Sequence, residues 1–268
     1  MVNVERGFFQ LKGSNKMSYP EDWLKDIEPL VGGFRNKRVL DVGCDWQALV
    51  VQALATSFGV EEAIGINLIA EDKQYIQRAK TLRADVRDLP FPDNYFDVIV
   101  SSSAFEHIRG LDQGLRELYR VLKKGGHVYS HFGPIWSTCY GHHLWVVEKG
   151  KLFNYHNVIL PPWCHLLMEM VELRALLEAQ ESKLPIDSIL NWVYHSDEQN
   201  RLFFEDYETI FQESPFRSMF VKGYYNHEFM TERYRPHIDP TIFDRLYSRY
   251  PRNRNWMYDG MTVFLRKD

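Results

Sequence analysis

Four histidines lie at or just after short apolar runs, where the loops of an enzyme commonly begin. His107 follows one such run, His131 ends the next, and His142 and His143 lie in the loop beyond it. Because histidine titrates near neutral pH, each could act as a general base that removes a proton from a hydroxyl group. We therefore take these four side chains as the candidate catalytic residues.

The loop that contains two of these histidines also carries large aromatic side chains, namely Trp136, Tyr140 and Trp145. Three interpretations are open. The loop could bind an acceptor, with a histidine as base and aromatics stacked on a sugar ring or another flat group. It could bind a divalent metal through His131 and His142 or His143. It could also be a packed cap with buried histidines. Because no H-x₃-H, H-E-x-x-H or cysteine pair is present, we expect no metal site.

A second group of polar residues lies where an apolar run ends in a glycine. Asp41 closes the run 39–42, and Gly43 and Cys44 follow it. Apolar residues then recur at helical spacing up to residue 54. Strand, glycine turn and helix form the opening of nucleotide-binding α/β domains, in which the helix N-terminus faces an anionic group. The segment 38–54 is therefore the candidate cofactor turn.

The elements that must position these residues alternate between strands and helices. A helix is predicted over 111–122 by its apolar spacing and by the Lys123-Lys124-Gly125-Gly126 stop. The near-continuous apolar run 96–101 is typical of a parallel strand buried on both faces. Residues 38–132 therefore predict an α/β fold with a doubly wound parallel sheet, whose strands we place at 39–42, 63–68, 82–85, 96–101 and 128–132.

The rest of the chain is less regular. Residues 1–36 form a lead-in, and a helix over 163–183 is predicted from leucines and methionine at helical spacing. A helix over 204–214 and strands over 218–225 and 257–266, the last antiparallel, would complete the sheet. We thus predict a single domain over 1–268 that carries two lid-like insertions, at 134–202 and 226–255.

Composition narrows the class of protein. The chain has 268 residues and a net charge of −4, which gives no support for nucleic-acid or anionic-membrane binding. Three scattered cysteines favour a reducing compartment. The first residues lack the apolar core of a signal peptide, and no apolar run approaches the ~20 residues that span a bilayer. We expect a cytoplasmic protein with no nucleic-acid partner and no membrane span.

Three blocks of sequence, taken together, resemble the class I S-adenosylmethionine-dependent methyltransferases. They are VLDVGC, ADVRDLPFPDNYFDVIVSSSAFEHI and LRELYRVLKKGGHVYSHFGP. The resemblance covers about residues 38–133 and is strongest in the middle block. It implies a Rossmann-like, mostly parallel sheet of seven strands and S-adenosylmethionine as the cofactor.

The resemblance also assigns roles to residues at the predicted strand ends. Asp41 and Gly43 would line the turn under the methionine part of the cofactor, with Cys44 beside them. Asn67 stands where a ribose-binding acid is usual. The remaining implied contacts are Asp85 with the backbone of Val86 beside the adenine, and Ser101 and Ser102 beside the sulfonium.

Two features depart from the family pattern. The first loop usually reads Asp-x-Gly-x-Gly-x-Gly, but Asp45 and Gln47 replace the second and third glycines. Asn67 replaces the ribose-binding acid, so the charge-assisted hydrogen bonds of a carboxylate are lost. Either the cofactor binds to an altered loop, or the fold has lost its cofactor.

From these features we expect methyl transfer from S-adenosylmethionine to a small-molecule acceptor. A hydroxyl of a sugar or glycan precursor is the preferred acceptor, on the basis of the histidine- and aromatic-rich loop. One alternative is a non-catalytic methyltransferase-like protein that serves as a binding partner. Another is a methyltransferase that acts on protein or lipid. The sequence does not indicate an oligomeric state.

Overall fold

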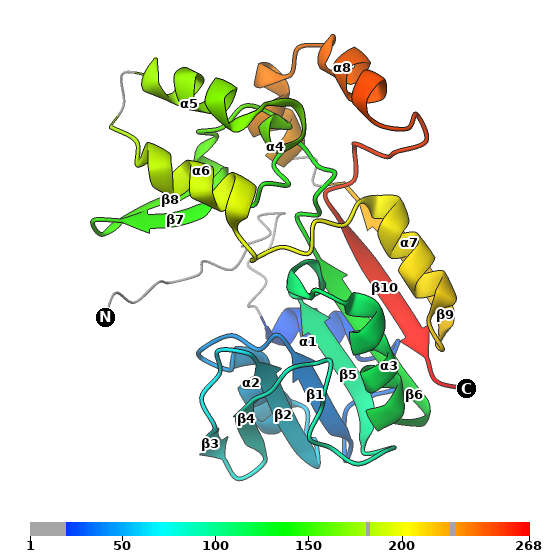
Figure 1. Ribbon diagram of the computed structural model, residues 1–268. Helices are drawn as coiled ribbons and strands as arrows, with labels where there is room; N and C mark the ends of the chain where they lie inside the picture. Colours follow the sequence, from blue (N-terminus) through cyan, green and yellow to red (C-terminus); the bar gives the residue numbers. More distant parts are fainter. Residues whose placement is uncertain (1–19, 181–182, 226–228) are drawn as a thin grey trace. The chain divides into compact units, whose positions relative to one another are not determined.

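The computed structural model describes residues 20–180, 183–225 and 229–268, and it divides into two compact units. The sheet unit extends to Phe132 and also includes Glu208–Lys222 and Met261–Asp268, whereas the helical unit consists of Gly133–Tyr207 and Gly223–Gly260 (Figure 1). The segments predicted as insertions fall mainly in the helical unit. Their action as lids and the single-domain assignment stay predictions. Residues 1–19 of the predicted lead-in lie outside the described residues.

The main sheet has eight strands in the order β3-β4-β2-β1-β5-β6-β10-β9. Strands β4, β2, β1, β5 and β6 are parallel to their neighbours within this run, and β10 is antiparallel to β6. The strand bounds are β1 Arg38–Val42, β2 Glu62–Asn67, β3 Lys73–Ile76, β4 Ala79–Arg83, β5 Phe96–Ser102, β6 Leu122–Phe132, β9 Arg217–Tyr224 and β10 Gly260–Arg266.

The predicted α/β fold with a mostly parallel sheet is confirmed, but three details were wrong. The sheet has eight strands because β3 adds an antiparallel strand beside β4. The strict alternation of strand and helix also fails, since β3 takes the place of a helix after β2 and a turn links β4 to β5. Strand β6 begins at Leu122, six residues before its predicted start, so the lysines and glycines after the helix lie inside this strand.

Two helices of the sheet unit pack on one apolar cluster. Helix α1 (Glu21–Ile27) contributes Leu24 and Ile27, and α2 (Leu49–Ser57) contributes residues such as Val51 and Leu54. These side chains meet Val39 and Val98 from the centre of the sheet. Their burial removes apolar surface from water, which is the main driving force for folding.

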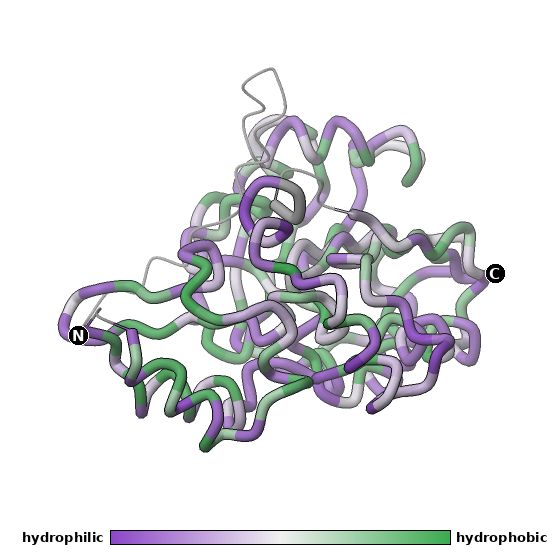
Figure 2. The backbone as a smooth tube through the Cα atoms, turned by 90° about the horizontal axis from the view of Figure 1, so that it is seen from above, coloured by the Kyte–Doolittle hydropathy of each residue, from purple (hydrophilic) through white to green (hydrophobic). Residues whose placement is uncertain are grey.

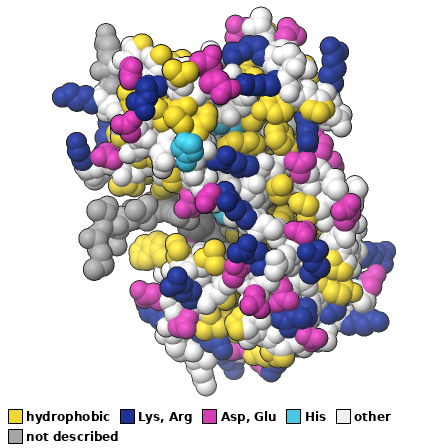
Figure 3. Space-filling view, viewed as in Figure 1, with side chains coloured by type: hydrophobic (Ala, Val, Ile, Leu, Met, Phe, Trp, Pro, Cys, Tyr) yellow, Lys and Arg dark blue, Asp and Glu magenta, His cyan; other side chains and the backbone are white. Residues whose placement is uncertain are grey.

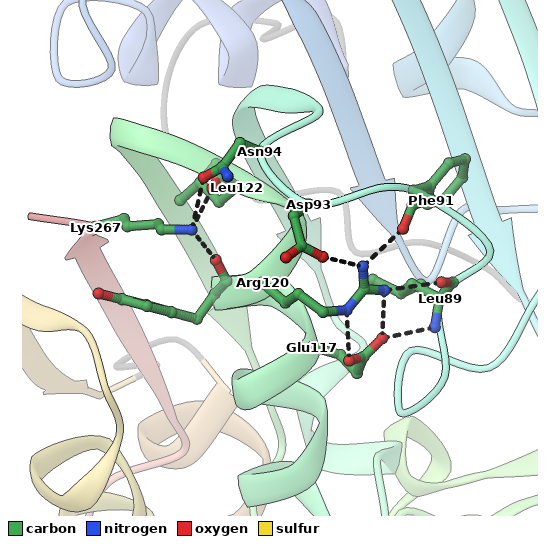
Figure 4. A network of polar contacts seen from close by, with 9 residues as sticks. Leu89, Phe91, Asp93, Asn94, Glu117, Arg120, Leu122 and Lys267 are labelled. Atoms are coloured by element: carbon green, nitrogen blue, oxygen red, sulfur yellow. Dashed lines mark hydrogen bonds and ion pairs between the residues drawn. The ribbon is translucent and has the colours of Figure 1, made fainter.

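Helix α3 (Leu111–Val121) is held to the preceding turn by the side chain of Arg120 (Figure 4). The guanidinium donates to the carbonyl oxygens of Phe91 at 2.8 Å and Leu89 at 3.0 Å. It also pairs with Asp93 at 2.9 Å and, through two nitrogens, with Glu117 at 2.9 and 2.8 Å. Only the planar fork of arginine offers enough donors for this set of acceptors.

The helical unit contains a two-stranded sheet and several short helices. Strands β7 (Trp145–Glu148) and β8 (Lys151–Asn154) form a hairpin whose two turn residues, Lys149 and Gly150, both have positive φ, as a tight hairpin requires. The helices are η2 Tyr155–Asn157, α4 Cys164–Leu167, α5 Met170–Glu178, α6 Ile186–His195, η3 Phe229–Tyr234, η4 Arg235–His237 and α8 Ile242–Arg249, and α7 Phe204–Glu213 extends from this unit into the sheet unit.

The continuous helix predicted over 163–183 was wrong, because the chain breaks between α4 and α5. Met168 is extended, and Glu169 starts a new helix. Glu169 and Glu172 form a reciprocal capping box that satisfies backbone donors at the start of α5. Apolar periodicity runs through the break and therefore could not reveal it.

Aromatic rings form the core of the helical unit. Tyr140 stacks on Tyr155 with ring centroids 5.7 Å apart and on Tyr234 at 5.0 Å. Tyr234 donates its hydroxyl to the carbonyl oxygen of Tyr155 at 2.7 Å. His165 lies in the same unit, buried against Trp136 with ring centroids 4.5 Å apart. Burial lowers the pKa of His165 to about 4.

The surface is that of an ordinary globular protein. Figure 2 shows apolar and polar residues following one another along the chain in short segments, as amphipathic elements require. On the face shown in Figure 3, acidic and basic side chains are intermixed. None of the described helices is long and apolar enough to cross a bilayer.

Replacing Arg120 by Lys should destabilise the protein by about 2 kcal/mol, because carbonyl oxygens and a carboxylate of the 89–93 turn lose their donors. Chemical denaturation followed by circular dichroism measures this loss. Arg116→Lys is the matched control, since Arg116 on the same helix pairs, within the described part of the chain, with exposed Asp112 alone. A cost below roughly 0.5 kcal/mol, which is the usual effect of a surface substitution, would contradict a clamping role for Arg120.

Acidification should destabilise the protein through its buried histidines. The folded pKa of His165 is about 4, below the unfolded value of about 6.5. The stability contributed by the neutral ring is therefore complete above about pH 6.5. It falls as the pH drops toward 4, by up to about 1.4 kcal/mol per pH unit. Thermal melts across this range should show that the melting temperature of the native chain falls more steeply with decreasing pH than that of His165→Gln. Parallel curves would refute this account.

Candidate functional site

The predicted cofactor residues gather at one edge of the sheet unit. Strand β1 lies between β2 and β5, and all three run parallel, so their carboxyl ends meet. Val42 at the end of β1 is level with Ile66 of β2 and with Ser101 of β5. In open α/β sheets, ligands bind outside the carboxyl ends of the strands. The register therefore brings the ends of three predicted binding strands to the expected edge.

Gly43 turns the chain at the end of β1, in a position that only glycine can occupy. Its φ is +83°, and a Cβ atom built on it would lie 2.3 Å from the Cβ of Ala104. The amides of Gly43 and Cys44 both donate to the carbonyl oxygen of Ile66, at 2.8 and 3.0 Å. The turn is thus fixed between β2 and the segment that follows β5.

The carboxyl group of Asp41 is buried inside the sheet unit, and its hydrogen bonding is incomplete. It is 3% exposed, and none of the described residues hydrogen-bonds its Oδ2 atom. Burial, and secondarily the charge of Asp45, raises the pKa of Asp41 well above its usual range. A buried carboxylate of this kind fits a cationic ligand group, because such a group would offset the cost of ionisation. S-adenosylmethionine carries a sulfonium and an ammonium group, so Asp41 and the glycine turn fit this cofactor.

The two residues that replace family glycines belong to the turn itself. The Asp45 carboxylate accepts from the amide of Gln47 at 2.7 Å and from that of Leu49, the first residue of α2, at 3.1 Å. Asp45 therefore satisfies backbone donors at the helix start. An Asp shortly before a helix is a sequence signal for such a cap.

Asn67, at the end of β2, also bonds to the backbone near the turn. Its Nδ2 donates to the carbonyl oxygen of Cys44 at 3.0 Å, and its Oδ1 accepts from the amide of Ile69 at 3.3 Å. Cys44 is buried, and its Sγ would lie 2.9 Å from a Cβ built on Gly65. Burial raises the pKa of the Cys44 thiol, so the thiol stays protonated. Cys44 is a small packing residue rather than a reactive one.

Asp85 follows β4 and is paired with a residue that the sequence analysis missed. Arg87 contacts the Asp85 carboxylate at 2.6 Å, and its backbone amide donates to the same group at 2.9 Å. These interactions lower the pKa of Asp85 below its ordinary value. Val86 is buried beside Gly114 of α3, so its backbone is held in place. The spacing Asp-x-Arg was the only signal in the sequence for this pair.

The serines after β5 differ from one another. Ser101 is fully buried and donates its hydroxyl to the carbonyl oxygen of Val42 at 2.9 Å, which ties β5 to β1. Ser102 is partly exposed and is level with His131 of β6. Of the two predicted residues, Ser102 therefore has the more accessible side chain at the strand ends.

Two of the predicted catalytic histidines belong to the sheet unit. His107 has a side chain that is 30% exposed, and its Nε2 lies 3.8 Å from the Oε1 of buried Glu106. Nδ1 of His131 contacts the hydroxyl oxygen of Thr262 at 2.8 Å. Burial lowers the pKa of His131 to about 4, so this ring is neutral and a weak base at neutral pH. Glu106 is the functional candidate that sequence reasoning missed, although it directly precedes His107.

The other two histidines belong to the helical unit. His142 is 2% exposed, and its Nδ1 accepts from the amide of Leu144 at 3.1 Å, which places the ring proton on Nε2. Burial lowers the pKa of His142 well below its usual range. Nδ1 of His143 contacts the Nε2 atom of Gln199 at 2.6 Å. Among the described residues, no group of three or more His, Cys, Asp or Glu side chains could hold a metal ion.

Comparison with known proteins agrees with this geometry. A family model described as "Methyltransferase domain" matches residues 40–130. The demethylmenaquinone methyltransferase of Geobacillus sp. (strain WCH70) is 27% identical over 115 residues, which are 40% of this chain and 49% of that protein. The chloroplastic 2-methyl-6-phytyl-1,4-hydroquinone methyltransferase of Arabidopsis thaliana is 39% identical over 69 residues, or 26% and 20% of the two chains. The chain thus spans about half the length of the demethylmenaquinone relative and less of the plant relative.

The fold has a matching solved structure. An S-adenosylmethionine-dependent methyltransferase from Mesorhizobium loti superposes with a TM-score of 0.52 at 15% identity, covering 90% of this chain and 96% of that one. The parallel sheet, the glycine turn after β1 and the matched segment 40–130 agree with one another. Residues 40–130 therefore resemble a methyltransferase domain, and the chain shares the fold of a class I S-adenosylmethionine-dependent methyltransferase.

Proposed function

We propose that this protein transfers a methyl group from S-adenosylmethionine to a small-molecule acceptor at the carboxyl edge of the sheet unit. The observation that carries the proposal is the buried carboxyl of Asp41 beside the turn at Gly43. An incompletely compensated acid is costly in a folded protein unless a cation neutralises it. The cofactor of this family supplies such a cation.

The residues at the strand ends would hold the cofactor. Asp41 would face its cationic methionine part, the backbone at Gly43 would pass close to it, and Asp85 with Val86 would lie beside the adenine. When bound, the cofactor supplies an electrophilic methyl group on sulfur. The protein then mainly orients the acceptor, and such alignment is worth about 7–11 kcal/mol of the barrier.

His107 is the best-placed base for a hydroxyl acceptor. It is partly exposed, and the carboxyl of Glu106 lies 3.8 Å from its Nε2, where its charge would stabilise the imidazolium. His131 is less suited, because a base with a pKa of about 4 has little tendency to hold a proton at neutral pH. We assign proton removal to His107 and a positioning role to Glu106.

We propose that the acceptor is a hydroxyl-bearing small molecule and, more specifically, a sugar or glycan precursor. Support for a sugar comes from the aromatic loop residues, of which Trp136 and Trp145 keep partial exposure while Tyr140 is buried. The relatives named for demethylmenaquinone and a phytyl hydroquinone suggest a second class, quinone and hydroquinone rings. An acceptor screen should therefore contain both sugars and hydroquinones.

A non-catalytic role is the second candidate, and one observation favours it. Asp45 and Asn67 bond to the chain's own backbone near the turn. A folded protein that binds no cofactor at millimolar concentration would support this role and would refute the enzyme.

Replacing Asp41 by Asn should have opposite effects on binding and on stability. Affinity for S-adenosylmethionine should fall at least roughly tenfold, because a buried charge partner is lost. The ligand-free protein should gain about 1–2 kcal/mol at pH 8, because an inadequately compensated buried carboxylate is removed. Since the raised pKa makes the folded state bind the extra proton, the native chain loses stability as the pH rises from about 4. This loss should be absent in the variant.

Calorimetric titration and thermal melts at pH 5 and pH 8 would measure these two effects. Asp187→Asn is a suitable control, since Asp187 is also an acid but has a side chain that is 88% exposed. Asp41→Asn with unchanged affinity for the cofactor would argue against Asp41 as a ligand.

Replacing His107 by Gln should lower kcat by about 10²–10⁴-fold with a hydroxyl acceptor, because the general base is lost. The dissociation constant of the cofactor should not change. His195→Gln, which alters an exposed histidine at the end of α6, is the control for a general effect of losing a histidine. A kcat within threefold of the native value, roughly the scatter of such comparisons, would show that orientation alone drives the reaction.

A further inference from the structure

Most backbone amides of the turn between β1 and α2 already donate hydrogen bonds within the chain. The amides of Gly43 and Cys44 donate to Ile66, and the amide of Ala48 donates to the carbonyl oxygen of Asp45 at 3.0 Å. The amides of Gln47 and Leu49 donate to the Asp45 carboxylate. Five amides between residues 43 and 49 therefore already have acceptors within the chain.

The Asp45 carboxylate is thus placed where a ligand anion would otherwise bind. The start of a helix carries a partial positive charge and unpaired amides, so it attracts carboxylates and phosphates. In this protein both oxygens of Asp45 accept hydrogen bonds there, at 2.7 and 3.1 Å. A second carboxylate brought to the same amides would have to displace Asp45 and would be repelled by its charge.

The neighbouring side chain is also an acid. Asp45 is near enough to Asp41 to act on its ionisation, and Asp41 has an oxygen without a partner among the described residues. Asn67 further holds the turn through the carbonyl oxygen of Cys44. Two carboxyl groups therefore lie near one another at this edge of the sheet unit, and one of them is already bonded to the amides of Gln47 and Leu49 at the helix start.

We infer that Asp45 takes the place of the cofactor's carboxylate at the start of α2, so that this site recognises S-adenosylmethionine through its cationic groups. The ammonium and sulfonium groups are drawn to the acidic edge, and the carboxylate of the cofactor adds little to its affinity. Asp45 is in this sense a specificity-determining residue. The inference rests on the proposed function, because it assumes that the cofactor binds at this edge.

The test compares two probes that differ only in the carboxylate, namely S-adenosylmethionine and its decarboxylated form. Isothermal titration of the full chain should give dissociation constants within about threefold of each other. Asp45→Asn keeps an oxygen acceptor for the cap but removes the charge. In this variant S-adenosylmethionine should bind about tenfold more tightly relative to the decarboxylated form, because repulsion between two carboxylates is relieved.

Asp187→Asn controls for the loss of one negative charge, since Asp187 lies in the first turn of α6 in the helical unit. It should leave the ratio of the two dissociation constants unchanged. Circular dichroism melts would establish that each variant is folded at the temperature of the titration. A binding ratio is a suitable measure because a general loss of stability would weaken both probes equally.

The outcomes separate the two proposals. If the native chain binds S-adenosylmethionine more than about tenfold better than the decarboxylated probe, and Asp45→Asn does not increase this preference, the inference is wrong while the proposed function stands. If neither probe binds to the folded native chain or to Asp45→Asn, the cofactor site and the inference both fail. If only Asp45→Asn binds S-adenosylmethionine, the native site does not recognise the cofactor through its cationic groups, and the inference and the proposed function both fail.

Discussion

The close approach of Gly43 to Ala104 is the constraint on which the rest of the site depends. Because no Cβ atom fits between them, the turn after β1 is pressed against the segment that follows β5. The hydroxyl of Ser101 bonds to the carbonyl oxygen of Val42 at the same level and ties the two strands together. These contacts place the carboxyl ends of β1 and β5 side by side. They thereby also determine where the residues that follow these strands lie. His107, three residues after Ala104, is one of these residues.

At this edge of the sheet, a buried acid that could serve ligand binding lowers the stability of the folded protein. A buried carboxyl such as Asp41 makes the empty protein less stable than a neutral residue would, and such groups are typical of sites that bind charged ligands. Asp45 strengthens the effect on Asp41, yet it stabilises α2 by accepting from its first amide. One carboxylate is thus used as a structural cap, and its neighbour Asp41 has an oxygen without a hydrogen-bond partner among the described residues.

The histidines show how burial separates residues of one type into different roles. His142 and His165 lie inside the helical unit as neutral rings, whereas His107 keeps part of its side chain exposed beside an acid. A neutral buried ring contributes packing and single hydrogen bonds and makes a poor base. Of the three interpretations of the loop after β6, burial of His142 fits the packed cap, while the acceptor-site interpretation remains a proposal.

Local chemistry in the sequence determined the main elements of the sheet unit. The apolar run 96–101 predicted β5, and a glycine after the run 39–42 predicted the turn that follows β1, because backbone conformation and strand burial depend on residues that are adjacent in the chain. Only the tertiary structure decided what the polar side chains do. Asn67 bonds to Cys44 and His131 contacts Thr262, partners that lie far away in sequence and leave no trace in local pattern. The extra strand β3 and the break before α5 escaped prediction for a related reason: competing backbone hydrogen bonds, not apolar spacing, determine where those elements begin.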